Sequence, residues 1–280
     1  MLELNLEDMA KAAAAGDVNA AEELLRAIVH DVHGLALRML WHPIDAEDAT
    51  EEILVDIVSH LHEVTTDVRT GTLRIASRFL LRTYESPMER QDWTFEEMGE
   101  HLDRGLAEEV PADVPPEVAP VFAEEVKIGC TQTMLLCLDR PHRLAYVLSD
   151  VLELDEAIAA DIVGIEPPLF RALLVNARDR LHAFMGARCG VINPASSCRC
   201  TRRLGRDLRT GRVDPRRLLF VVPDRPGSDT REPKQAPSFD ELSGDPARVF
   251  RDQELRPAPP WIVERVSTFL RTHEPELLRA

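Results

Sequence analysis

The stretch LDEAIAADIVGIEPPLFRALLVNARDRL, residues 154–181, decides the fold of this chain. Gly164 ends a first helix, because glycine readily adopts the left-handed conformation that a helix terminus needs. Pro167 and Pro168 suit only the first turn of a second helix, where a missing amide hydrogen costs little. Apolar residues then recur every three or four positions and give this helix one buried face: Phe170, Leu174, Ala177 and Leu181. The stretch therefore predicts two helices joined by a tight turn.

Two interpretations of this helical pair stay open. A helix-turn-helix places its second helix in a DNA major groove, and the small Ala160 lets two helices cross closely. The other interpretation is an ordinary helical hairpin within an all-helical core.

Composition indicates a helical protein. Ala, Leu, Glu and Arg are abundant among the 280 residues, and only 5% are aromatic, which favours helices over sheet. No apolar run is long enough to span a bilayer, and the acidic N-terminus does not resemble a signal peptide. We therefore expect a cytoplasmic protein with no membrane partner. The five cysteines are odd in number and clustered late, which favours metal ligands or free thiols over disulfides.

The formal net charge of −16 limits the possible partners. A free-standing DNA binder is usually basic, because neutralisation of phosphates supplies much of its affinity. Either this chain does not bind DNA, or another molecule brings it there.

An acidic helix follows an N-terminal helix that Asp17 is expected to cap. Its sequence is DAEDATEEILVDIV, residues 45–58, with Asp45 as the expected N-cap. Its outer face carries Asp48, Glu51, Glu52 and Asp56. Acidic residues near a helix N-terminus are stabilised by the helix dipole, so a solvated face is one interpretation. The other is a docking face for a basic partner.

Three segments in this order resemble the extracytoplasmic-function (ECF) sigma factors. The acidic run at 45–58 resembles region two of that family, which docks on the clamp helices of RNA polymerase. VRTGTLRIASRFLLR, residues 68–82, is similar to the helix with which the family binds the promoter −10 element. The helical pair at 154–181 resembles region four, which recognises the −35 element. Order and spacing match over about residues 15–188.

The resemblance implies an all-α protein that is not itself an enzyme and that brings core RNA polymerase to promoter DNA. It implies a region-two-like domain at residues 1–90, an acidic linker at 91–125 and a region-four-like domain at 126–188. A segment rich in Cys and Arg follows at 189–220. The last part, 221–280, is expected to be a partly extended regulatory extension that ends in a helix.

The resemblance also implies which residues contact the partners. Polymerase would contact Asp48, Glu51, Glu52 and Asp56. Promoter DNA would contact Arg69, Arg74, Arg78, Arg82, Pro168, Leu169, Arg171, Ala172, Val175, Asn176 and Arg178.

This sequence departs from the family pattern at two places. The usual tryptophan of the −10 helix falls on Gly71 and its aromatic neighbour on Leu73. Stacking of an aromatic ring on a displaced base contributes about 1–3 kcal/mol, so their loss puts promoter melting in question. Leu173 and Asn176 stand where the family often has basic residues, which implies fewer phosphate contacts.

The linker is rich in Pro, Glu and Asp and is interpreted either as a flexible spacer or as a segment that follows the RNA exit path of polymerase. It contains one amphipathic stretch that predicts a short helix, with Phe95, Met98 and Leu102 on one side.

The run CGVINPASSCRC, residues 189–200, suits thiolate coordination of a structural zinc ion. Cys189, Cys198 and Cys200 supply three ligands. The fourth is Cys130, His182 or His142, with Cys130 preferred. A similar run occurs in a subgroup of ECF-like sigma factors with C-terminal extensions. The alternative is three reduced thiols on a loop.

The chain ends with a basic block and an amphipathic tail. The block at 199–217 could contact DNA, RNA or the chain's own acidic linker. The tail predicts a helix with an apolar stripe of Trp261, Ile262, Val266, Phe269 and Leu270. We expect this helix to pack on one of the sigma-like domains and to regulate it from within the chain.

Two other functions remain open. The first is a sigma-like adaptor that binds polymerase or another partner without opening promoters, as Gly71, Leu173 and Asn176 suggest. The second is a zinc-dependent hydrolase, for which only the cysteines argue.

Overall fold

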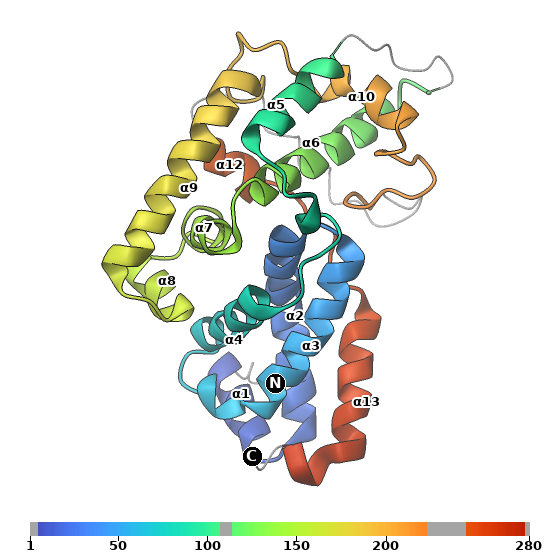
Figure 1. Cartoon of the computed structure of the whole chain (residues 1–280). Helices are drawn as coiled ribbons and strands as arrows, with labels where there is room; N and C mark the ends of the chain where they lie inside the picture. The colour runs from blue at the N-terminus through green and yellow to red at the C-terminus, as the bar shows by residue number, and fades with distance from the viewer. Residues whose placement is uncertain (1–4, 107–113, 223–244, 278–280) are drawn as a thin grey trace. The chain divides into compact units, whose positions relative to one another are not determined.

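The computed structural model describes residues 5–106, 114–222 and 245–277, and over these ranges the chain is helical with no strand (Figure 1). This confirms the all-α fold. None of the described helices is both long and apolar enough to cross a membrane. The helices are α1 (Leu6–Ala14), α2 (Val18–Leu40), α3 (Pro43–Ser59), η1 (Leu61–Glu63), α4 (Val68–Arg82), η2 (Glu89–Gln91), α5 (Phe95–Arg104), α6 (Ala119–Leu136), α7 (Arg140–Tyr146), the π-helical η3 (Val147–Val151), α8 (Glu156–Val163), α9 (Pro167–Arg188), α10 (Cys200–Arg209), α12 (Pro246–Arg251) and α13 (Pro260–Leu277).

The chain divides into two compact units that are not simply consecutive in sequence. The first unit contains Met1–Arg90, Leu154–Arg171 and Pro257–Ala280. The second contains Gln91–Glu153 and Ala172–Arg256. The boundary therefore falls inside α9, and the C-terminal segment contributes to both units.

In the first unit, α2 packs on α3 and both pack on α4. Asp17 caps α2 as predicted, since its carboxylate accepts the backbone N–H groups of Asn19 and Ala20. The apolar stripes of α2 and of the helix after it are buried: Ala21, Leu24, Leu25, Ile28, Val29, Val32, Leu35, Leu37, Ala49, Ile53, Ile57, Val58 and Leu61.

The start of α3 corrects one prediction. The N-cap is His42, whose Nδ1 accepts the N–H of Ile44, and Pro43 occupies the first turn. Asp45 lies inside the helix and not at its cap. Proline fixes the backbone of the first turn without losing an internal hydrogen bond, so the helix begins before the acidic run.

Gly71 is buried where α4 lies against η1. A Cβ atom at this position would lie 2.5 Å from the carbonyl oxygen of Glu63 and 2.8 Å from Cα of Val64. Both atoms belong to the backbone, so no side chain fits at this position without moving η1. Leu73 is also buried.

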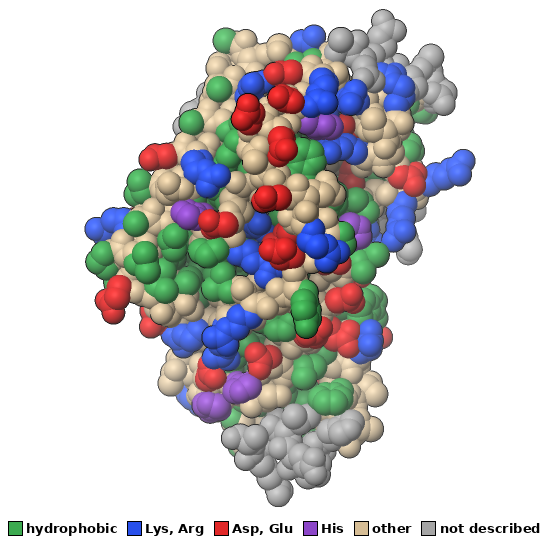
Figure 2. Space-filling view, in the orientation of Figure 1, with side chains coloured by type: hydrophobic (Ala, Val, Ile, Leu, Met, Phe, Trp, Pro, Cys, Tyr) green, Lys and Arg blue, Asp and Glu red, His purple; other side chains and the backbone are tan. Residues whose placement is uncertain are grey.

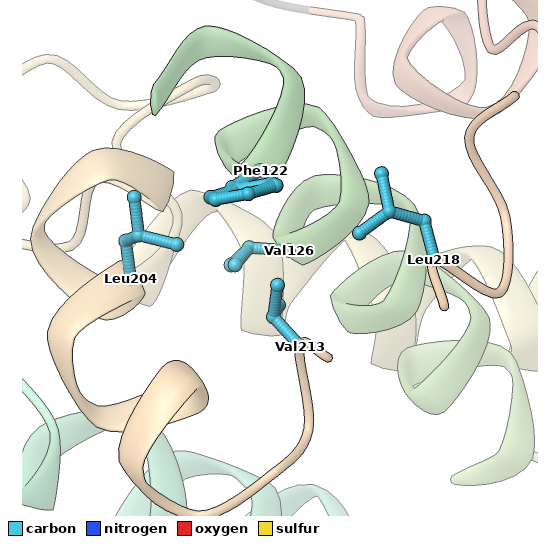
Figure 3. Packing of buried hydrophobic residues seen from close by; sticks show 5 residues of the cluster. All are labelled: Phe122, Val126, Leu204, Val213 and Leu218. Atoms are coloured by element: carbon cyan, nitrogen blue, oxygen red, sulfur yellow. The ribbon is translucent and has the colours of Figure 1, made fainter. Parts of the chain in front are cut away.

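In the second unit, α6 packs on α10. Figure 3 shows the apolar cluster that joins them, formed by Phe122, Val126, Leu204, Val213 and Leu218. The buried carboxylate of Glu125 on α6 accepts the backbone N–H groups of three consecutive residues, 219–221. This contact fixes the chain after α10 along α6.

Parts of the expected linker and extension belong to this core. The helix α5 forms as predicted, with Met98 and Leu102 buried and the ring of Phe95 5.2 Å from that of Phe184. In the extension, Phe250 of α12 is fully buried.

Candidate DNA- and polymerase-binding surfaces

The turn between α8 and α9 has the geometry that the sequence predicted. Asp155 caps α8 by accepting the N–H of Ala157, and Gly164 ends the helix with φ of +75°. The N–H groups of Gly164 and Ile165 both donate to the carbonyl oxygen of Ala160, at 2.9 and 3.1 Å. A residue with a side chain would be strained at this φ, so glycine is required by the turn.

The second helix of this pair, α9, has one buried and one exposed face. The four predicted core residues are fully buried: Phe170, Leu174, Ala177 and Leu181. Of the predicted DNA-facing positions on α9, Arg178 is half-buried. The others are exposed: Pro168, Leu169, Arg171, Ala172, Val175 and Asn176. This outer face is mainly apolar, since Leu169 is 54% and Val175 46% exposed.

The two predicted arginines of α9 are paired with carboxylates of the same chain. Nε of Arg171 lies 2.9 Å from Glu156. Arg178 holds Asp150 with two hydrogen bonds, of 2.8 and 2.6 Å, and the side chain of Asp150 is only 11% exposed. Arg178 therefore has a structural partner, whereas the pair of Arg171 is open to solvent.

The four predicted arginines of α4 differ in their exposure. Arg69 and Arg82 are exposed. The half-buried Arg74 is paired with Asp161 of α8, and Arg78 lies 3.4 Å from Glu63 of η1. Phosphate binding by Arg74 or Arg78 would have to replace these carboxylates.

The predicted polymerase-binding residues line a hollow on the outside of α3. Asp48 and Glu52 are exposed, and Glu51 and Asp56 are half-buried. Asp56 is 2.9 Å from His60, and Glu51 is 3.0 Å from Arg265 of α13. The hollow measures about 660 Å³ and is lined by Asp48, Glu51, Glu52, Val55, Asp56, Ser59, His60, Phe79 and Arg265.

The four predicted zinc ligands come from separate parts of the second unit. Cys130 lies on α6, Cys189 directly follows α9, and Cys200 begins α10. Cys198 pairs with Cys189 in an isolated parallel β-bridge. Gly190 permits this pairing, because a Cβ atom there would lie 2.0 Å from the carbonyl oxygen of Cys198.

The intervening loop is held in shape by hydrogen bonds from its own side chains. The amide of Asn193 donates to the carbonyl oxygen of Gly186 at 2.8 Å, and the hydroxyl of Ser196 donates to that of Arg188. Arg199 donates to the carbonyl oxygens of Pro194, Ser196 and Cys198.

Electrostatic coupling relates the four thiols. Burial raises the pKa of Cys130 well above its ordinary value, and Cys200, Cys189 and Cys198 raise it further. Burial raises the pKa of Cys198 to about 11 and that of Cys200 to about 12. As the side chains stand, no three His, Cys, Asp or Glu residues of the described ranges could together hold a metal ion.

Each of the two histidines proposed as a fourth ligand has one ring nitrogen in contact with another side chain. His142 Nδ1 lies 2.6 Å from Asp139, and His182 Nε2 lies 3.3 Å from the hydroxyl of Tyr146. Cys130 is the candidate whose pKa responds to the other three thiols.

The basic block contacts the predicted linker, a possibility that the sequence left open. Buried Arg203 donates to the carbonyl oxygens of His101 and Leu102 at 3.0 Å and lies 2.9 Å from His101 Nε2. Arg188, at the end of α9, pairs with Asp103 of α5. Sequence reasoning did not identify His101 or Trp93, over which the guanidinium of Arg212 lies. In the sequence, the only feature that marked these two residues was their aromatic ring within an acidic segment.

No continuous basic surface is visible on the face in Figure 2, where basic and acidic side chains are interspersed.

No model of a known protein family matches the chain, and no curated protein matches it either.

Proposed function

We propose that this protein is a sigma factor of the ECF type, which binds core RNA polymerase in the cytoplasm and directs it to specific promoters. In this proposal the acidic outer face of α3 binds polymerase. The exposed arginines of α4 contact the −10 region, and α9 contacts the −35 region. The nucleotidyl transfer chemistry belongs to polymerase.

The observation that supports this proposal best is the pair α8–α9. Its glycine-terminated first helix, the buried stripe of α9 and the exposed face of α9 are features that a helix-turn-helix requires. The acidic α3 and the arginine-bearing α4 precede this pair in the order that the family motifs have.

The acidic charge is compatible with this function when polymerase supplies the DNA-binding context. A sigma factor held on polymerase experiences a high effective concentration of promoter DNA, so each of its own contacts can be weak. Arg171 can supply such a weak contact, because its pair with Glu156 is exposed. Surface pairs contribute only about 0–1 kcal/mol, so phosphate can replace the carboxylate.

One observation favours the alternative of a sigma-like adaptor. The position that carries the melting aromatic in the family is Gly71, which is buried against backbone. A side chain there could not reach a displaced base. An adaptor of this kind would bind polymerase and would not open the promoter.

Run-off transcription with bacterial core polymerase and a genomic promoter library tests the proposal. We expect discrete transcripts that depend on the protein, and their loss in an Arg171→Ala variant, whose side chain is 68% exposed. The control is Arg26→Ala, which removes an arginine of α2 that is 59% exposed and, like Arg171, is paired with a carboxylate. Polymerase binding without transcripts from any form would select the adaptor, and no binding to polymerase would exclude the sigma factor.

We also propose that Cys130, Cys189, Cys198 and Cys200 hold a structural zinc ion. Zinc prefers four nitrogen or sulfur ligands in a tetrahedron, and this group would tie α6 to the end of α9 and the start of α10. We expect one zinc per chain by elemental analysis, and less than a tenth of it in a Cys130→Ser variant. The control is Cys137→Ser, which lies outside this group. Full zinc content in Cys130→Ser would exclude Cys130 as the fourth ligand.

A further inference from the structure

The helix α13 belongs to the first unit and lies beside the proposed polymerase-binding face. It packs on α2 and α3, and its inner residues Ile262, Val266 and Leu270 are at most 1% exposed. Phe269, which the sequence placed in the buried stripe, is 37% exposed. Burial of the inner residues holds the helix in place, because apolar area removed from water is the main source of such binding energy.

One cation of α13 reaches the acidic hollow of α3. Nη1 of Arg265 lies 3.0 Å from Glu51, and the guanidinium also stacks 5.4 Å from the centre of the Trp261 ring. Arg265 is the only Lys or Arg residue among the described residues that line this hollow. A second pair joins Arg271 to Glu22 of α2 and fixes the following turn of the helix.

The hollow therefore presents carboxylates to a basic partner, and a basic residue of the chain itself already occupies its edge. The exposed Asp48 and Glu52 remain open to a partner. Glu51 is already paired, so a cation that binds it competes with Arg265.

We propose that α13 is a tethered competitor of RNA polymerase for the acidic face of α3. This inference rests on the proposed function, because it names the regulation of the same face. Docking of the basic clamp helices separates Arg265 from Glu51 and moves α13 away from α3. The segment thus acts as an inhibitor that is part of the chain.

The tether makes this competition effective although each contact is modest. A covalently linked segment acts at a high effective concentration, in the millimolar range for a short flexible connection. The apparent affinity for polymerase is the intrinsic affinity reduced by the fraction of molecules in which α13 is displaced. If α13 is docked in nine of ten molecules, and polymerase binds only when it is displaced, its release tightens binding about tenfold.

The test uses the full chain with a substitution on the inner face of α13. Val266→Asp places a charge at a buried position and should release the helix, which loss of amide-exchange protection over α13 would verify. We expect the dissociation constant for core polymerase to fall about tenfold. The matched control is Thr268→Asp, the same new side chain at an exposed position of the same helix. It should leave the dissociation constant within twofold of the wild type.

A second variant does not depend on the inner face. Arg265→Ala changes a side chain that is 63% exposed and so should leave the fold intact. We expect it to tighten polymerase binding about two- to fivefold. Equal affinity of the wild type and Val266→Asp, with α13 shown to be released, would overturn the competition and leave the proposed function standing. Failure of every form to bind polymerase, including the released one, would overturn the proposed function and this inference together.

Discussion

Gly71 explains at the level of one residue why α4 can lie so close to η1. Replacing it by alanine brings a methyl group against the backbone of Glu63 and Val64. We expect Gly71→Ala to destabilise the protein by about 1–3 kcal/mol through overpacking, although alanine inside a helix gains about 1 kcal/mol over glycine. Urea unfolding measures the change. The control is Gly186→Ala in α9, where a Cβ atom meets nothing within 4 Å and where we expect equal or higher stability. Equal stability of the two variants would contradict the steric argument.

His101 should make stability depend on pH. Burial lowers its pKa to about 4, and the nearby guanidinium groups act in the same direction: Arg212, Arg203, Arg206 and Arg104. The unfolded chain binds a proton near the ordinary pKa of about 6.5, so it gains protons first as the pH falls. Stability contributed by the neutral ring is therefore present above pH 6.5 and is lost towards pH 4. Because water screens the half-exposed ring, we expect a loss on the order of 1–2 kcal/mol.

The histidine effect is isolated by comparison with His101→Gln, whose amide oxygen still accepts from Arg203 but does not titrate. Urea unfolding between pH 7.5 and pH 4.5 should show a steeper decline for the wild type than for this variant. Parallel declines would assign the acid sensitivity to other groups.

At the scale of elements, α6 holds the chain after α10 through one carboxylate. Glu125 accepts N–H groups from Leu219, Phe220 and Val221 at 2.6–3.2 Å while it is 3% exposed. In Glu125→Gln an amide N–H₂ group would face these donors, so at least one buried donor loses its acceptor. We expect a loss of about 2–3 kcal/mol in the free energy of unfolding. Glu124→Gln is the matched control, because Glu124 is partly exposed and makes one ion pair, with Lys127, so this variant should change stability by less than about 1 kcal/mol.

Helix positions followed from local signals, whereas contacts between helices did not. Gly164, the two prolines of α9 and its four-residue apolar stripe predicted the turn, and Asp17 predicted the start of α2. The prediction that Asp45 caps α3 was wrong, because an acidic residue in a first turn resembles an N-cap in sequence. The helix starts earlier, at Pro43. The pairs of Arg74 with Asp161 and of Arg265 with Glu51 join residues far apart in the chain. No periodicity encodes such pairs, and the sequence therefore assigned Arg74 and Glu51 to external partners.

For the whole molecule, the net charge bears on whether the proposed promoter binding can occur without polymerase. The net charge is −16, and four of the arginines expected to contact DNA are paired with carboxylates of the chain: Arg74, Arg78, Arg171 and Arg178. A free chain of this kind is repelled by the phosphate backbone, and each phosphate contact it does make changes the salt slope of log K by only about 0.9.

We therefore expect promoter recognition to depend on polymerase. With a labelled promoter duplex in 150 mM salt, the protein alone should give no saturable anisotropy change at micromolar concentrations, and the protein with core polymerase should bind at nanomolar concentrations. Substitution of Glu156 by Gln leaves Arg171 without its carboxylate partner and should strengthen binding by the polymerase complex a few-fold, with a salt slope steeper by up to about 1. Glu166→Gln removes an exposed carboxylate that precedes the same helix and separates this pairing effect from a general change in charge. Tight binding of the free wild-type chain would show that its own DNA contacts suffice, and polymerase would then not be needed to explain how so acidic a protein reaches DNA.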